Sequence, residues 1–150
     1  MFKFDFDIKE FEKSLSRLNQ EVRENIAKSA AVAGAQVIRD EAKLRAPVYD
    51  PKTGERVNKK AKPGALRDAM YVAHSEKQSS SKQKAVTVSW NAKKAPHGHL
   101  VEFGHWLVIN GKTIRRVPGV GFLGGAFEAA SGRAIKAAQE RIKQKLDALK

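Results

Sequence analysis

Three histidines and a glutamate fall within the nine residues from His97 to His105, so this segment has the side chains of a possible metal site. Imidazole and carboxylate groups bind zinc, and a zinc ion with an open fourth position can activate water for hydrolysis. The spacing lacks the two histidines four residues apart that zinc proteases carry on one helix face. If residues 98–103 are helical, His99 and Glu102 share a face that His97 does not. Exposed histidines beside one structural glutamate are therefore favoured, and a zinc-dependent hydrolase using His97, His99 and His105 is kept as an alternative.

Other catalytic patterns are missing from the sequence. The chain has no cysteine, which excludes disulfides, thiolate metal sites and a cysteine nucleophile. No Gly-x-Ser-x-Gly sequence is present, and the glycines at 119–121 and 124–125 lack the Lys-Ser/Thr of a phosphate-binding loop. The sequence therefore favours a protein that is not an enzyme and needs no cofactor.

Positive charge is concentrated in two stretches of the chain. The net charge is +13, and residues 43–67 and 77–94 carry most of it. Both are rich in residues typical of connectors, so we expect flexible basic loops at 48–63 and 76–84. Their candidate partner-binding residues are Lys52, Arg56, Lys59, Lys60, Lys62, Lys82 and Lys84. Such loops suit an acidic protein surface or a polyanion.

A nucleic-acid-binding protein is the main alternative function. Tyr49 is the only aromatic residue in the basic loops, so base stacking and sequence-specific readout are not supported. Trp90 and Trp106 fall in predicted strands and are interpreted as core or sheet-face residues. What is left is non-specific attraction to phosphates, which would weaken steeply with salt.

The chain has the length of one domain, residues 1–150. Asp7 is a candidate helix cap, and apolar residues recur every three or four positions from Ile8 to Val37, with the pattern reaching Leu44. This predicts a helix of roughly 55 Å that ends near Ala46-Pro47, with a break into two helices at Gly34 as the alternative. No apolar run approaches the ~20 residues of a membrane span, and no secretory signal is visible.

The rest of the chain predicts two hairpins and two further helices. Strands at 70–74 and 86–90 make the first hairpin, and strands at 106–109 and 112–114 flank Asn110-Gly111, a strong hairpin-turn signal. A short helix is expected within 97–104 and a long one towards the C-terminus. The predicted fold is α+β, with a four-stranded, mostly antiparallel sheet and the long C-terminal helix packed on it. Small residues at 29–35 and the alanines of the C-terminal helix predict close helix packing within the chain.

Three blocks of the sequence together resemble a known family. They are Ala46-Pro47 followed by Gly64-Ala65-Leu66-Arg67-Asp68-Ala69, then Ala95-Pro96 with Val101-Glu102-Phe103-Gly104, and finally Gly121-Phe122-Leu123-Gly124-Gly125-Ala126-Phe127-Glu128. Their order is similar to that of the tail-completion, or head–tail joining, proteins of long-tailed, siphovirus-type bacteriophages. Residues 48–63 are a basic insertion relative to that pattern, and His105 stands where the family often has threonine.

The resemblance implies a structural virion protein of the phage neck. Similar proteins form a ring, expected to be a hexamer, that caps or terminates the tail tube and offers the head connector a docking surface, while DNA passes through the lumen. The implied partners are further copies of the chain, the tail tube protein and the connector. Assembly is expected in the host cytoplasm and involves no membrane. Glu102 would be structural, accepting backbone hydrogen bonds or forming a polar pair with Arg67.

Overall fold

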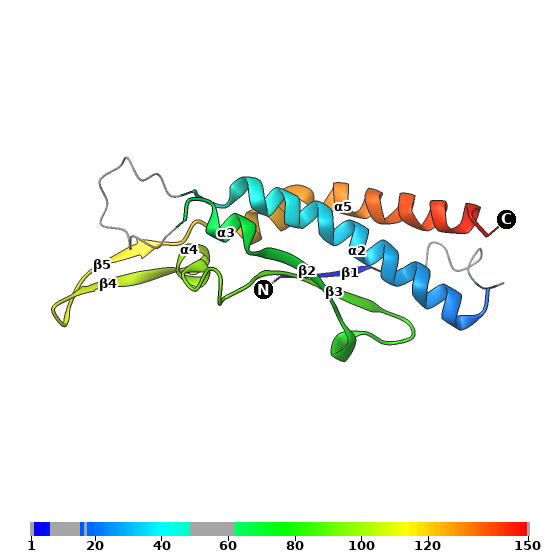
Figure 1. Ribbon diagram of the computed structural model, residues 1–150, viewed down its shortest axis with the longest axis horizontal. Helices are drawn as coiled ribbons and strands as arrows, with labels where there is room; N and C mark the ends of the chain where they lie inside the picture. The colour runs from blue at the N-terminus through cyan, green and yellow to red at the C-terminus, as the bar shows by residue number, and fades with distance from the viewer. Residues whose placement is uncertain (1, 7–15, 17, 49–61, 150) are drawn as a thin grey trace.

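The computed structural model describes residues 2–6, 16, 18–48 and 62–149. Figure 1 shows an elongated molecule in which two long helices lie side by side over a small sheet, and a second hairpin projects at one end. In chain order the elements are β1 (Phe2–Phe6), α2 (Gln20–Arg45), α3 (Ala65–Asp68), β2 (Met70–Ser75), the 3-10 turn η3 (Glu76–Gln78), β3 (Lys84–Trp90), α4 (Gly98–Phe103), β4 (Gly104–Ile109), β5 (Lys112–Pro118) and α5 (Phe122–Asp147).

The strands form two separate antiparallel sheets, and the α+β class is confirmed. One sheet has the order β1-β3-β2, with Val88 of β3 opposite both Val72 and Phe2, and the other contains only β4 and β5. The predicted single sheet of four strands is therefore wrong. The third strand of the first sheet is the N-terminal Phe2–Phe6. Its alternation of phenylalanine with charged residues is typical of a strand, although no strand was predicted there.

Helix α2 begins later than predicted. Asn19 caps it, since its side-chain oxygen accepts a hydrogen bond from the backbone N–H of Val22 at 2.9 Å. Residues 16, 18 and 19 are not helical, so a single helix from the Asp7 cap to Leu44 is wrong, although Asp7 itself lies outside the described residues. Helix α2 runs through Gly34 without a break. The predicted end is confirmed, because α2 stops at Arg45, directly before Ala46 and Pro47.

Small side chains allow α2 and α5 to pack closely. Fully buried alanines line the contact from both helices, namely Ala30, Ala31, Ala35, Ala126, Ala130, Ala134 and Ala138. At the rim, the Glu41 carboxylate of α2 bonds Arg133 of α5 at 2.6 Å. The predicted small-residue contact within one chain is confirmed. Helix α5 packs mainly along α2 and reaches the sheet at β1, whereas α2 contacts all three strands.

Gly132 of α5 is expected to be a stabilising position for alanine. An added Cβ would meet no atom within 4 Å, and the backbone there is helical. Gly132→Ala should raise the free energy of unfolding by about 0.5–1 kcal/mol, because alanine loses less backbone entropy in a helix. Thermal unfolding followed by circular dichroism measures this. Gly111→Ala is the matched control: its Cβ also meets open space, but φ is +76°, so this variant should lose about 1 kcal/mol. Equal effects at both glycines would contradict the prediction.

Candidate functional site

Glu102 caps a helix to which it does not belong. The residue is only 5% exposed, and its carboxylate oxygens accept hydrogen bonds from the backbone N–H groups of Leu123 at 2.9 Å and Gly124 at 3.1 Å. The N-cap residue of α5 is Gly121, which has no side chain to offer. The first N–H groups of a helix need acceptors, and a negative charge there also interacts favourably with the helix dipole. The expectation that Glu102 accepts backbone hydrogen bonds therefore agrees with the structure.

Arg67 does not contribute to this arrangement. It lies exposed on the short helix α3. Within the described parts of the chain, no ion pair joins it to Glu102. The Glu102 carboxylate is instead occupied by the first turn of α5.

Backbone contacts join the end of α4 to the start of α5. The N–H of Val120 donates to the carbonyl oxygen of Val101 at 2.7 Å, and that of Gly121 donates to Glu102 at 3.1 Å. Between these segments, Gly104 has φ +78°, and a Cβ there would stand 2.4 Å from the carbonyl oxygen of Val117. The second and third blocks of the resemblance thus meet in space, and together they form the base from which the second hairpin projects.

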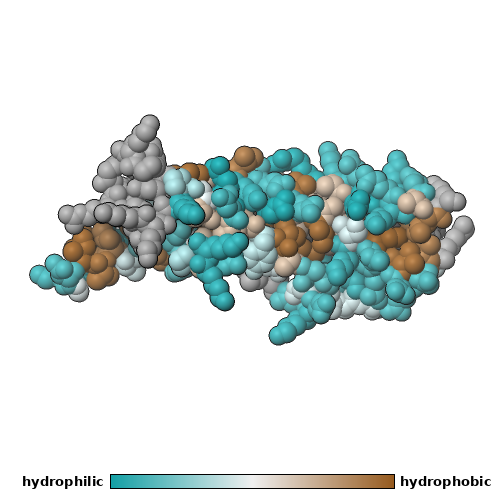
Figure 2. All heavy atoms as spheres, viewed as in Figure 1, coloured by the Kyte–Doolittle hydropathy of each residue, from teal (hydrophilic) through white to brown (hydrophobic). Residues whose placement is uncertain are grey.

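The hairpin β4–β5 exposes a cluster of large apolar side chains. Its turn is the predicted Asn110-Gly111, with φ angles of 50° and 76°. Figure 2 shows the apolar residues gathered behind the polar tip. We call them the hairpin patch; each is more than half exposed, and they are Phe103, Trp106, Val108, Ile109, Ile114 and Val120. Large exposed apolar clusters mark contact surfaces.

One face of the hairpin combines apolar and cationic groups. Trp106 of β4 stands directly opposite Arg116 of β5, and the Arg116 guanidinium lies over the Trp106 ring, 5.9 Å from its centroid. The register shifts between Leu107 and Val108, so simple alternation does not place Ile114 on this face. A surface of this kind can bury apolar area while its arginine meets carboxylates or phosphates. Of the two interpretations of Trp106, core or sheet face, the structure agrees with the sheet face, since Trp106 lies in β4 and is 60% exposed.

The candidate zinc ligands do not converge. His97 and His99 are exposed at the start of α4, whereas His105 is partly buried in β4, and its Nδ1 has no hydrogen-bond partner. Among the residues with described positions, no three His, Asp or Glu side chains are grouped so that they could hold a metal ion. The arrangement therefore offers no support to the zinc-hydrolase alternative.

The candidate basic residues divide into three groups. Lys52, Arg56, Lys59 and Lys60 lie outside the described residues, while Lys62 and Lys82 are exposed. Lys84 is largely buried and pairs with Glu24 of α2 at 2.8 Å, and its hydrogen bond lowers the pKa of the Glu24 carboxyl. Lys84 thus holds β3 against α2.

The predicted loop at 76–84 contains ordered local structure. It includes the turn η3, and Ser79 Oγ donates to the backbone oxygen of Ser75 at 2.6 Å and accepts from the N–H of Ala85 at 3.0 Å. These bonds close the first hairpin on itself.

Comparison with known proteins identifies the family. Residues 9–104 match the model of the HK97-gp10-like family, whose description reads "Bacteriophage HK97-gp10, putative tail-component". No curated protein and no solved structure gave a match. None of the helices in the described parts of the chain has both the length and the apolar character needed to cross a membrane. The family match covers more than half of the sequence and includes the Ala-Pro and Glu-Phe-Gly blocks. The chain therefore belongs to the HK97-gp10-like family of bacteriophage tail components.

Proposed function

We propose that the chain is a neck protein of the virion that forms a six-membered ring at the head-proximal end of the tail tube and joins the tail to the head connector. The observation that carries this proposal is the hairpin patch, of which Trp106, Val108, Ile109 and Ile114 lie on β4–β5 and Phe103 and Val120 lie at the base of the hairpin. A monomer in water gains nothing from exposing six large apolar residues on a projecting hairpin and its base, whereas a subunit of a ring buries them against its neighbour.

The hairpin supplies the features that such a contact requires. Both of its strands have a free edge, since β4 and β5 pair only with each other among the described strands. Ring closure satisfies free edges by covering or pairing them. The cations Lys112, Arg115 and Arg116 on β5 would meet acidic groups of the neighbour, the tube or the connector, and basic groups that reach the lumen would attract DNA without reading its sequence.

The test places charge in the hairpin patch. The variant Trp106→Glu/Ile114→Glu should fold normally, because both residues are more than half exposed. It should still fail to complement a phage that lacks its own copy of the gene. We expect infective particles to fall by at least about a hundredfold, since charges buried in an apolar contact cost several kcal/mol per subunit. Electron microscopy should show full heads and separate tails.

The control changes a comparable residue far from the hairpin. Ile135→Glu introduces one such carboxylate on the surface of α5, where Ile135 is 45% exposed, and should leave the titre within about twofold. Normal joined particles with the double variant, at normal folding and abundance, would refute the proposal. Tails of uncontrolled length rather than separated tails would support the capping role within it.

A further inference from the structure

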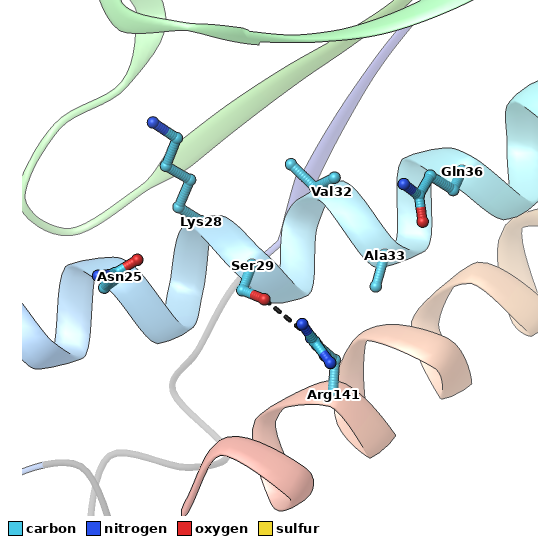
Figure 3. A pocket seen from close by; sticks show the side chains of 7 residues that line it. All are labelled: Asn25, Lys28, Ser29, Val32, Ala33, Gln36 and Arg141. Carbon is cyan, nitrogen blue, oxygen red and sulfur yellow. Dashed lines mark hydrogen bonds between the residues drawn. The ribbon is translucent and has the colours of Figure 1, made fainter.

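A shallow groove runs along the outer face of α2, beside α5. It encloses about 510 Å³ and is lined by Asn25, Lys28, Ser29, Val32, Ala33, Gln36 and Arg141. Figure 3 shows Lys28 on the side towards the sheet and Arg141 reaching in from α5 on the other side. The groove lies towards the end of the molecule opposite to the hairpin β4–β5 (Figure 1).

The charge that the described residues give this groove is positive. None of the lining residues with described positions is acidic. The Arg141 guanidinium donates only to neutral acceptors in the described structure: its Nε bonds Ser29 Oγ at 2.9 Å, and its Nη1 bonds Gln144 Oε1 at 3.3 Å. Among the described residues, none forms an ion pair with Lys28. Its positive charge acts on nearby His74, whose pKa is lowered first by burial and then by Lys28 and Lys84.

The lining of the groove fits a peptide better than a nucleic acid. Val32 and Ala33 give it a small apolar floor, and the amides of Asn25 and Gln36 can both donate to and accept from a peptide backbone. A phosphate backbone has only hydrogen-bond acceptors, so it would use neither the apolar floor nor the accepting oxygens of the amides. The Ser29 bond holds one edge of the Arg141 guanidinium, so the planar fork is pre-oriented for a carboxylate.

We infer that this groove binds an acidic peptide segment of another virion protein, with carboxylates at Arg141 and Lys28 and apolar side chains over Val32 and Ala33. The inference goes beyond ring formation through the hairpin patch and does not depend on it. A ring subunit with this groove would hold a second protein on its helical side while its hairpin contacts the next copy.

The test measures binding of a fluorescently labelled oligoglutamate peptide to the full chain at low salt by anisotropy. Lys28→Glu/Arg141→Glu should weaken binding by at least about tenfold. The matched control, Lys136→Glu/Lys143→Glu, removes the same charge from exposed positions of α5 outside the groove and should change binding by less than about threefold. Lys28→Gln/Arg141→Gln provides the same test if the charge-reversed pair folds poorly.

Either of two other outcomes would contradict the inference that the groove binds an acidic peptide. Equal losses in the groove pair and the control pair would show general attraction to a basic protein and would overturn the inference. Single-stranded DNA could displace the peptide from the parent chain and from the control pair but not act on the Lys28→Glu/Arg141→Glu pair. That result would identify the groove as a nucleic-acid site. The measurement is peptide binding, so a negative result would not affect the proposal that the hairpin patch forms the ring contact. Likewise, a negative result for that proposal in the phage assembly experiment would not affect this inference.

Discussion

Glu102→Ala is expected to lower the free energy of unfolding by about 2–4 kcal/mol and the melting temperature by roughly 5–12 °C. The carboxylate is buried and bonds two backbone N–H groups at the start of α5. Alanine would leave both donors without an acceptor in a place where water has little access, and it would remove the negative charge at the positive end of the helix. The loss exceeds that of an ordinary exposed cap because the Leu123 donor is buried and the Gly124 donor is partly buried.

Two further variants separate this capping role from a general charge effect. Glu102→Gln keeps one side-chain oxygen and places an NH₂ group near the other donor, so its cost should be intermediate, about 1–2 kcal/mol. Glu140→Ala removes an exposed carboxylate from α5 itself and should stay within about 0.5 kcal/mol of the parent chain. Denaturant titration of the three proteins gives the comparison. A loss at Glu140 equal to that at Glu102 would refute the capping argument.

Individual helices and turns could be predicted from the sequence where a single sequence signal determined the local structure. The Asn110-Gly111 turn needs two positive φ angles that few other pairs adopt, and it has them. The C-terminal helix and the end of α2 also agree with their apolar spacing and with Pro47. The start of α2 was not predictable in the same way, because the three- and four-residue spacing includes Leu18, which is not helical, and Asn19 rather than Asp7 caps the described helix.

Relations between elements were harder to predict than the elements themselves. The alternation of residue types along β4 and β5 does not indicate whether these strands join the first sheet. In the structure they form a separate sheet. Trp90 and Trp106 have similar strand contexts, but Trp90 packs against Phe122 while Trp106 is 60% exposed. The exposed face of the hairpin was therefore missed. The pairing of its apolar positions with Arg115 and Arg116 in the next strand is the signal that could have revealed it.

Gly98→Ala is expected to cost about 3 kcal/mol, although alanine is the better helix former. A Cβ at Gly98 would lie 2.2 Å from Nε1 and 2.4 Å from Cε2 of the Trp90 ring. That ring packs on the fully buried Phe122, with the centroids 5.9 Å apart, so it cannot move without disturbing the core. The helix propensity of alanine contributes about 1 kcal/mol in the opposite direction, and overpacking of this severity exceeds it. Thermal and denaturant unfolding measure the net loss.

A double-mutant cycle with Trp90→Leu identifies the cause. Leucine removes the ring atoms that the new Cβ would meet, so Gly98→Ala should cost less than about 1 kcal/mol in that background, a coupling of about 2 kcal/mol. A cost that is the same in both backgrounds would refute the clash with the ring. Fluorescence gives an independent measurement, since Trp106→Phe leaves Trp90 as the single tryptophan. In that protein Gly98→Ala should shift the emission to the red, because a ring displaced from Phe122 loses apolar contact and becomes more exposed to water. This displacement would loosen the junction from which α4 presents Glu102 to α5.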